Sequence, residues 1–202
     1  MKVIGLTGGI GMGKSASVEL LAKRGVPVVD TDELARRLVE PGQPALQEIL
    51  QAFGKEMIGP DGRLRRATLA QAVFAEKDKR EKLEGILHPR IRDLWRARLL
   101  DWQREGRPLA VVVIPLLFET RAETEFDDVI CVACTPEIQR QRLLNRGWTP
   151  ESIEQRIAAQ WPVAQKILRS NYVIWTEGDL DAHSRQLDRV LSQSSSAPSA
   201  AC

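Results

Sequence analysis

The segment that most constrains this chain is a glycine-rich stretch close to its start. Residues 8–15 read Gly-Gly-Ile-Gly-Met-Gly-Lys-Ser and satisfy the pattern G-x-x-x-x-G-K-[ST]. In this pattern the glycines let successive N–H groups curl around phosphate oxygens, the lysine reaches the β and γ phosphates, and the hydroxyl binds Mg²⁺. The stretch follows an apolar run, Lys2 to Leu6, and opens an amphipathic pattern from Lys14 to about Gly25. We therefore predict a strand, a phosphate-binding loop and a helix whose positive end faces the phosphates.

Further apolar runs predict the rest of a sheet. A second run, Val26 to Val29, completes a strand–helix–strand unit, and such a unit forces a parallel sheet. Three more buried strands are predicted at 109–114, 129–133 and 172–175. We therefore predict a three-layer α/β structure, the P-loop NTPase fold, with a parallel five-stranded sheet.

The composition is that of an ordinary globular chain and argues against two classes of protein. The 202 residues carry 29 Lys and Arg against 27 Asp and Glu, a formal charge of +2, whereas a dedicated nucleic-acid binder usually shows a clear basic excess. The longest apolar run, Leu109 to Phe118, is far shorter than the about 20 residues of a membrane span. Met1 and Lys2 lead into the first strand without a secretory signal. We expect a cytoplasmic protein that binds neither nucleic acid nor membranes.

Two of the three cysteines form a C-x-x-C motif. Cys131 and Cys134 lie in and just after an apolar run and lack a second ligand pair or a nearby histidine. We interpret them as buried strand residues and not as a zinc or redox site.

Two acidic residues, Asp30 and Asp32, follow the second predicted strand directly. This places them at the carboxyl edge of the sheet, where doubly wound folds bind their ligands. Carboxylates at i and i+2 can direct one group at Mg²⁺ or its waters and the other at an acceptor hydroxyl, whose proton a base takes during attack on the γ-phosphate. The alternative is that Thr31 or Asp32 caps a helix beginning at Glu33, which is compatible with catalysis.

A basic segment lies between the fourth and fifth predicted strands. Residues 135–170 contain six basic and three acidic side chains, and Arg142 and Arg146, four residues apart, share one helical face. In phosphoryl transfer, arginines on a closing lid neutralise the charge that builds on the phosphate oxygens and expel water. We predict that 135–170 is such a lid, in which Arg156 and Gln160 repeat the same spacing. The alternative is a solvated helix hairpin with surface arginines.

The interval between the second and third strands is too long for one crossover. It contains a Gly-Pro-Asp-Gly turn at 59–62 and helical patterns at 44–53, 68–74 and 91–100. We predict one domain over residues 1–191, made of a core (1–30, 108–134 and 171–191), a helical acceptor-binding insertion (31–107) and the lid. Residues 192–202, SQSSSAPSAAC, offer almost nothing to bury and predict a disordered tail.

The loop predicts nucleotide binding without deciding the reaction. The guanine-binding string N-K-x-D is absent from the sequence, which disfavours a GTPase. Motor and switch ATPases usually end a strand next to the loop strand in an acidic metal ligand. Here the candidate strand ends in Pro115, and Glu119 follows four residues later.

Several short strings, taken in order, resemble the dephospho-CoA kinase family. They are the loop GGIGMGKS, the D-x-D at 30–32, Ala35-Arg36 followed by LVEPG at 38–42, His88-Pro89, and PLLFE at 115–119. The resemblance runs from Val3 to about Gly178, and the strings together are far more specific than the loop alone. Members of the family use ATP to phosphorylate the ribose 3′-hydroxyl of dephospho-CoA, which gives CoA and ADP in the last step of coenzyme A biosynthesis.

The resemblance implies a role for each matching residue. ATP is expected to bind the loop and the turn after it, at Gly8, Gly9, Ile10, Gly11, Met12, Gly13, Lys14, Ser15 and Ala16. Asp32 is the expected general base, Lys14 with the lid arginines Arg142 and Arg146 the expected catalytic cations, and Mg²⁺ is expected at Ser15 and Asp30. The expected substrate-binding residues are Asp30, Arg36, His88, Pro115, Leu116, Glu119, Arg156 and Gln160. His88 has a second interpretation, a helix-breaking corner, because Pro89 restricts it away from the helical region.

The sequence departs from the family pattern at two places. Ala16 stands where members commonly carry Thr, beyond the expected metal ligand, so we expect little effect. Near the fifth strand the family usually reads A-D-x-x-I-x-N-x-G, and here Asn171 and Thr176 replace its Asp and Asn. We expect altered contacts on the adenine side and unchanged phosphate chemistry.

Two other functions stay open at this level. A nucleoside monophosphate kinase shares the loop, the insertion and the lid, and the strings H-P and P-L-L-F-E disfavour it. A nucleotide-dependent binding protein or switch would hydrolyse ATP only to release a partner, and the D-x-D together with the missing guanine motif disfavours it. The substrates expected from the resemblance are the small molecules ATP and dephospho-CoA.

Overall fold

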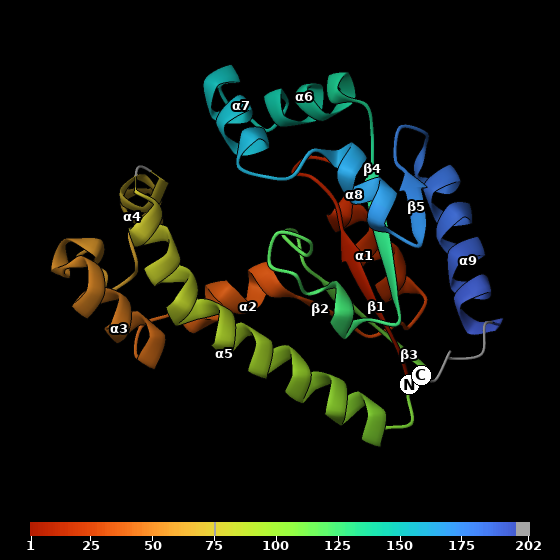
Figure 1. The fold of residues 1–202 in the computed structure, drawn as a ribbon, viewed down its shortest axis with the longest axis horizontal. Helices are drawn as coiled ribbons and strands as arrows, with labels where there is room; N and C mark the ends of the chain where they lie inside the picture. Colours follow the sequence, from red (N-terminus) through yellow and green to blue (C-terminus); the bar gives the residue numbers. More distant parts are fainter. Residues whose placement is uncertain (75, 197–202) are drawn as a thin grey trace. The chain divides into compact units, whose positions relative to one another are not determined.

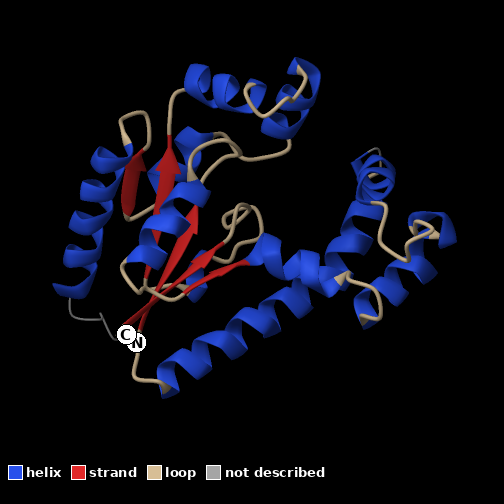
Figure 2. Ribbon diagram, turned by 180° about the vertical axis from the view of Figure 1, so that it is seen from behind, coloured by secondary structure: helices blue, strands red, loops and turns tan. Residues whose placement is uncertain are grey.

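Residues 2–7 form the central strand of a five-stranded sheet (Figures 1 and 2). The strand order is β2-β3-β1-β4-β5, in which β1 pairs in parallel with both β3 and β4, and β4 pairs in parallel with β5. The strands are β1 Lys2–Thr7, β2 Val28–Asp30, β3 Leu109–Val113, β4 Asp128–Ala133 and β5 Tyr172–Trp175. All of them lie close to their predicted bounds, and the prediction of a five-stranded parallel sheet is confirmed.

In the computed structural model, which describes residues 1–74 and 76–196, the chain divides into two units. The first unit holds Met1–Val29 and the chain from Trp102 onward, and the second holds Asp30–Asp101. The predicted insertion, 31–107, begins one residue later than the second unit and extends beyond its end. The difference at that end arises because the last helix of the interval, α5 (Lys77–Arg104), runs across the boundary.

In the first unit both faces of the sheet are covered, which is why its strands are apolar without strict alternation. On one face α1 and α9 contact each other and pack on Ile4 and Leu6 (Figure 1). On the other face a Cβ added at Gly5 would meet Leu117 and Phe126, and α8 contacts β4. The helices of this unit are α1 Lys14–Lys23, α6 Pro136–Leu144, α7 Pro150–Ala158, α8 Val163–Arg169 and α9 Leu180–Ser196.

Local chemistry sets the ends of several of these helices. After α1, Gly25 has a φ of +68° and donates its N–H to the carbonyl of Ala22, which ends the helix where the sequence predicts. Helices α6 and α7 both begin with the string Thr-Pro-Glu, in which the hydroxyls of Thr135 and Thr149 accept the backbone N–H groups of Ile138 and Ser152. Each proline lies in the first turn, where its missing N–H costs no hydrogen bond.

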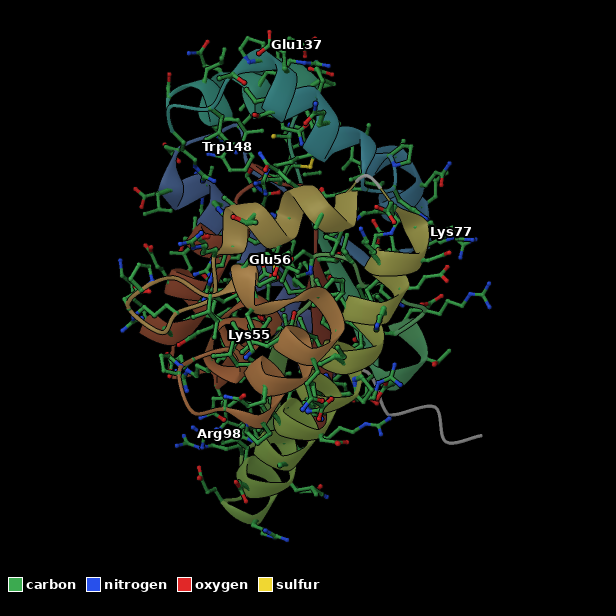
Figure 3. All side chains as sticks on the ribbon, turned by 90° about the vertical axis from the view of Figure 1, so that its left-hand side faces the viewer. Lys55, Glu56, Lys77, Arg98, Glu137 and Trp148 are labelled. Atoms are coloured by element: carbon green, nitrogen blue, oxygen red, sulfur yellow. The ribbon has the colours of Figure 1, made fainter. Side chains whose placement is uncertain are left out.

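The second unit is helical and has a core of its own. Its helices are α2 Thr31–Leu38, α3 Pro44–Phe53, α4 Arg66–Phe74 and most of α5. Apolar residues of α3 and α4, together with Val39 after α2 and Met57 between α3 and α4, form a buried cluster; from the two helices it contains Leu46, Ile49, Leu69 and Val73. Between α3 and α4, a short 3-10 turn, η1 (Lys55–Met57), exposes Lys55 and Glu56, and Lys77 and Arg98 are exposed on α5 (Figure 3).

Helix α5 corrects two predictions. Only residues 91–100 were predicted to be helical, and His88 was considered as a corner, whereas one helix of 28 residues runs through His88 and Pro89. A proline inside a helix removes one backbone hydrogen bond and can be tolerated where packing holds the helix. Here Arg90 donates to the carbonyl of Ile86 at 2.6 Å and to Glu48 at 2.5 Å. Despite its length, neither α5 nor any other helix within the described residues is apolar enough to cross a membrane.

The C-terminal helix corrects a third prediction. Residues 192–196 were predicted to begin a disordered tail, whereas α9 continues to Ser196. Ser194 is buried, its carbonyl accepts Lys2 Nζ at 2.7 Å, and its hydroxyl lies 3.4 Å from the carboxylate of Asp128. These contacts with β1 and β4 supply the burial that the local composition does not indicate. Residues 197–202 lie outside the described part of the chain.

Candidate functional site

The glycine-rich loop joins β1 to α1 in a conformation that suits glycine alone. Gly8, Gly11 and Gly13 have φ angles of +147°, +76° and +99°. A Cβ at Gly8 would lie 2.4 Å from the carbonyl oxygen of Val132 on the neighbouring strand. The loop leads directly into the N-terminus of α1, where unpaired N–H groups and the helix dipole favour an anion.

Lys14 is the first residue of α1, and its side chain turns back over the loop. Its Nζ donates to the carbonyls of Gly8 at 2.7 Å and Gly9 at 3.0 Å. Ser15 is exposed in the same helical turn, and Ala16 is half-buried. An ammonium group at the loop beside an exposed hydroxyl is the arrangement that phosphate and Mg²⁺ binding require.

Two glutamine side chains from the predicted lid bind the backbone N–H and the backbone carbonyl of one loop residue, Ile10. The side chain of Gln160, which follows α7, accepts the Ile10 N–H at 3.0 Å, and Nε2 of Gln139 on α6 donates to the Ile10 carbonyl at 2.8 Å. Gln139 is buried and was not predicted as a site residue. The helical spacing could have identified it, because Gln139 lies three residues before Arg142 and therefore on the same face of α6.

The three predicted lid arginines have different surroundings. Arg142 donates to the hydroxyl of Thr176 at 2.9 Å, to its carbonyl, and to the carbonyl of Gly11 at 3.5 Å. Arg146 is exposed in the turn that follows α6, because the helix ends at Leu144, so the prediction that Arg142 and Arg146 share one helical face is wrong. The guanidinium of Arg156 lies 4.4 Å from the ring centroid of Trp148. The structure therefore brings Arg142 to the loop and leaves the side chains of Arg146 and Arg156 on the lid.

The two residues that depart from the family pattern near the fifth strand have structural explanations. The side chain of Asn171 accepts the N–H of Val129 at 2.9 Å at the start of β5, and an aspartate oxygen could accept the same N–H. Thr176 is buried, and its hydroxyl also donates to the carbonyl of Met12 at 3.0 Å. Thr176 therefore links the loop to Arg142, and Asn171 helps to fix the register in which β5 pairs with β4.

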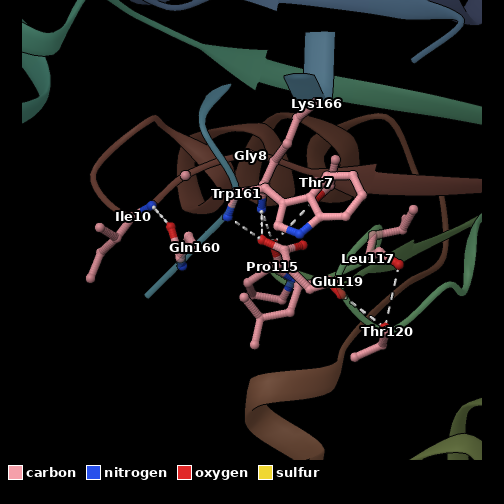
Figure 4. A network of polar contacts seen from close by, with 12 residues as sticks. Thr7, Gly8, Ile10, Pro115, Leu117, Glu119, Thr120, Gln160, Trp161 and Lys166 are labelled. Atoms are coloured by element: carbon pink, nitrogen blue, oxygen red, sulfur yellow. Dashed lines mark hydrogen bonds and ion pairs between the residues drawn. The ribbon is translucent and has the colours of Figure 1, made fainter. Parts of the chain in front are cut away.

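The segment after β3 carries a buried ion pair next to the loop (Figure 4). Nζ of Lys166 on α8 donates to the carbonyl of Pro115 and lies 2.8 Å from Oε1 of Glu119. The same Pro115 carbonyl accepts the hydroxyl of Thr7, the last residue of β1, at 3.2 Å. Sequence reasoning counted Lys166 only as one of the lid's charges, because nothing in the local pattern shows that it is fully buried.

Leu116 lies in the same segment and is half-buried. Its carbonyl accepts the hydroxyl of Thr120 at 2.8 Å, which helps to close the turn. Its role in substrate binding stays a prediction.

The second unit carries the remaining predicted residues. The α2 helix begins at Thr31, two residues before the predicted start, and its N-cap is Asp30, whose carboxylate accepts the Asp32 N–H at 2.8 Å. The cap is therefore Asp30 rather than Thr31 or Asp32, because the helix starts directly from the end of β2. Asp32 and Arg36 are exposed four residues apart on α2, and His88 is exposed on α5.

The C-x-x-C cysteines are interior residues. Cys131 on β4 and Cys134, just after the end of that strand, are both free and buried, which confirms their predicted burial. Burial raises the pKa of the Cys131 thiol to about 11, despite the opposing charges of Lys166 and Lys14. A thiol with this pKa is protonated at neutral pH and unreactive.

The sheet is parallel, its glycine loop lies at the N-terminus of α1, and Lys14 and side chains from residues 135–170 bond to that loop. These features define a nucleotide-binding protein of the P-loop kinase class. The family model for dephospho-CoA kinase matches residues 2–182. The chain belongs to the dephospho-CoA kinase family.

Individual comparisons agree with this assignment. The chain is 45% identical over 191 residues to the dephospho-CoA kinase of Bdellovibrio bacteriovorus, covering 95% of each chain. It is 44% identical to that of Anaeromyxobacter dehalogenans, covering 95% of this chain and 91% of the relative. A crystal structure from Thermus thermophilus superposes with a TM-score of 0.83 at 35% identity, covering 95% of this chain and 97% of that one.

Proposed function

We propose that this chain uses Mg-ATP to phosphorylate the ribose 3′-hydroxyl of dephospho-CoA, giving CoA and ADP. The identity of the acceptor substrate is inferred from the names of the relatives. The observation that carries the kinase chemistry is the position of Lys14, whose ammonium group lies over the carbonyls of Gly8 and Gly9 at the N-terminus of α1. No observation favours a nucleoside monophosphate kinase or a binding protein over this function.

The loop residues Gly8 to Ala16 bind the ATP phosphates in this proposal. The backbone N–H groups of the loop meet the phosphate oxygens, except that of Ile10, which stays on the Gln160 side chain, and Lys14 leaves the loop carbonyls to contact the β and γ phosphates. This exchange of partners is favourable because the Lys14 ammonium group binds a charged phosphate more strongly than a neutral carbonyl.

Ser15 and Asp30 are the proposed protein contacts of Mg²⁺. The donor set suits this ion, which prefers oxygen ligands, keeps several waters and is held largely by nucleotide phosphates with few protein ligands. Within the described residues there is no group of three or more His, Cys, Asp or Glu side chains that could hold a metal. Bound Mg²⁺ supplies positive charge to the β and γ phosphates.

Asp32 is the proposed general base. Its exposed carboxylate takes the proton of the 3′-hydroxyl as the oxygen bonds to the γ-phosphorus, while the bond from that phosphorus to the bridging oxygen breaks and ADP leaves. Arg142 and Arg146 neutralise charge on the transferring group. Arg36 and His88 bind the acceptor.

An acceptor panel tests the proposal. Purified protein with Mg-ATP should form ADP rapidly with dephospho-CoA and slowly with AMP, CMP or UMP. CoA is the matched control, since it carries the same pantetheine arm and adenosine with the 3′-oxygen already phosphorylated, and it should not stimulate ADP formation. ADP formation that dephospho-CoA does not accelerate would refute the proposal, and stimulation by a nucleoside monophosphate alone would identify the other kinase activity.

A further inference from the structure

The buried ion pair of Lys166 and Glu119 is not explained by stability. The Lys166 side chain is fully buried, and that of Glu119 is 15% exposed. Burying two charges costs several kcal/mol per ion, and apolar residues of similar volume in their place are often equally or more stable. In addition, Oε2 of Glu119 is buried without a hydrogen-bond partner among the described residues, which is itself unfavourable.

The other carboxylate oxygen of Glu119 holds the main chain at the end of the lid. Besides the Lys166 ammonium, Oε1 accepts the backbone N–H of Trp161 at 2.8 Å. The Trp161 ring is fixed as well, because it is stacked on Phe118 with ring centroids 6.4 Å apart and the Arg169 guanidinium lies 4.9 Å from its centroid. Residue 161 is therefore held through both its backbone and its side chain.

The preceding residue is the one that reaches the nucleotide-binding loop. Gln160 accepts the Ile10 N–H at 3.0 Å through its side-chain oxygen, as Figure 4 shows beside the Glu119 contacts. Two consecutive residues thus connect Glu119 to Ile10. Fixing Trp161 restricts where the Gln160 side chain can lie.

We propose that Glu119 is a positioning residue for the nucleotide-binding loop: held by Lys166, it fixes Trp161 and so keeps the Gln160 side-chain oxygen on the Ile10 N–H. This rests on the proposed function only in that the loop binds nucleotide phosphate, and it does not depend on the acceptor. Without Glu119 the Gln160 oxygen is no longer held on the Ile10 N–H, and the loop is less ordered before nucleotide binds. The free-energy cost of ordering the loop then weakens nucleotide binding.

Two matched double variants separate positioning from stability. E119M/K166M removes both charges and leaves the Trp161 N–H without an acceptor, whereas E119Q/K166M removes the same charges but keeps a carbonyl oxygen for that N–H. Thermal unfolding verifies that each variant is folded, and titration with ADP alone measures affinity. We expect E119M/K166M to bind ADP about tenfold more weakly than the parent, the effect of losing about one hydrogen bond, and E119Q/K166M to recover most of the loss. Equal ADP affinities in the two variants would show that the pair is only structural and would overturn the proposal.

A third variant tests the connection through Gln160. Q160L removes the acceptor for the Ile10 N–H and leaves the ion pair intact, so we expect an ADP affinity close to that of E119M/K166M and an unchanged melting temperature. The triple variant, E119M/K166M/Q160L, should bind ADP no more weakly than E119M/K166M, because Glu119 acts through Gln160. Fully additive losses of ADP affinity would show that Glu119 does not act through Gln160. If E119M/K166M does not fold, the Q160L titration decides, and unchanged ADP affinity overturns the proposal. Since the titration needs no acceptor, a failure here is distinct from failure of the acceptor panel.

Discussion

The hydroxyl of Ser17 lies 2.9 Å from Nε2 of His183, and both residues are buried where α1 packs against α9. Burial lowers the pKa of His183 below its ordinary value, and the positive charges of Arg142 and Arg24 lower it further. The imidazole is therefore neutral in the folded protein at neutral pH. Ser17 belongs to the first turn of α1, the helix whose N-terminus forms the proposed phosphate site.

The His183 environment makes folding sensitive to acid. Since the pKa is lower in the folded state than in the unfolded one, the unfolded state binds the proton first as the pH falls below about 6.5. The free energy of unfolding should be fully maintained above this pH and decline progressively as the pH falls toward and through the folded-state pKa. Urea denaturation at pH 7.5 and at successively lower pH values measures this decline.

The His183→Gln variant tests the source of the decline, because glutamine keeps a polar group for Ser17 without titrating. We expect a flatter dependence of the unfolding free energy on pH in this variant. His88→Gln is the comparison: burial lowers the pKa of His88 as well, with Glu84 opposing this and Arg92 adding to it. Its side chain is exposed on α5, so we expect this variant to flatten the dependence less than His183→Gln does. An equal decline in the His183 variant and the parent would exclude His183 as its origin.

Gly8 should tolerate no side chain. In Gly8→Ala the Cβ would lie 2.4 Å from the Val132 carbonyl oxygen and would require a φ of +147°, so we expect a stability loss of about 2–4 kcal/mol and loss of ADP binding. Gly25→Ala is the matched control, because Gly25 also has a positive φ, +68°, but its Cβ would meet nothing within 4 Å. That variant should lose only about 1 kcal/mol and keep ADP binding. Equal losses in urea denaturation would mean that the contact with Val132 is unimportant.

Asp32 should be needed for turnover and not for nucleotide binding. Asp32→Asn keeps the shape of the side chain but removes the base, so kcat should fall by about 10² to 10⁴ while ADP affinity is retained. Glu33→Gln is the control in the same helical turn; it removes an exposed charge that pairs with Arg37 and should change kcat little. Near-normal turnover in Asp32→Asn would remove Asp32 as the base.

Arg142 and Arg146 should differ in their effect on stability. Arg142→Ala removes donors to the hydroxyl and the carbonyl of Thr176, so we expect the free energy of unfolding to fall by about 1–2 kcal/mol together with a loss of activity. Arg146 is exposed, so Arg146→Ala should change stability by less than about 0.5 kcal/mol while still lowering kcat. Urea denaturation and steady-state kinetics of both variants check this, and a stability loss in Arg146→Ala as large as in Arg142→Ala would contradict it.

Local pattern was sufficient for most secondary-structure elements. The predicted range of α3 agrees with the structure, and the ends of α1 follow from Gly13 and Gly25. The local pattern did not predict the full length of α5, because a charged run and Pro89 disfavour a continuous helix there. It also did not predict the end of α9, where the serines give no apolar periodicity. In both places contacts outside the local segment stabilise the helix.

The sequence by itself determined the strand–loop–helix unit, the parallel sheet and the phosphate chemistry of Lys14, because these depend on residue types at fixed short spacings. Tertiary structure decided which distant side chains meet the loop. Gln139, Gln160 and Thr176 are brought to it by the neighbouring strands β4 and β5 and the lid between them. The burial of Lys166 beside Glu119 and of His183 beside Ser17 was decided in the same way. The physical reason is that burial and the partners of a polar group are set by packing between segments more than 40 residues apart, such as Glu119 and Trp161, which no short-range pattern encodes.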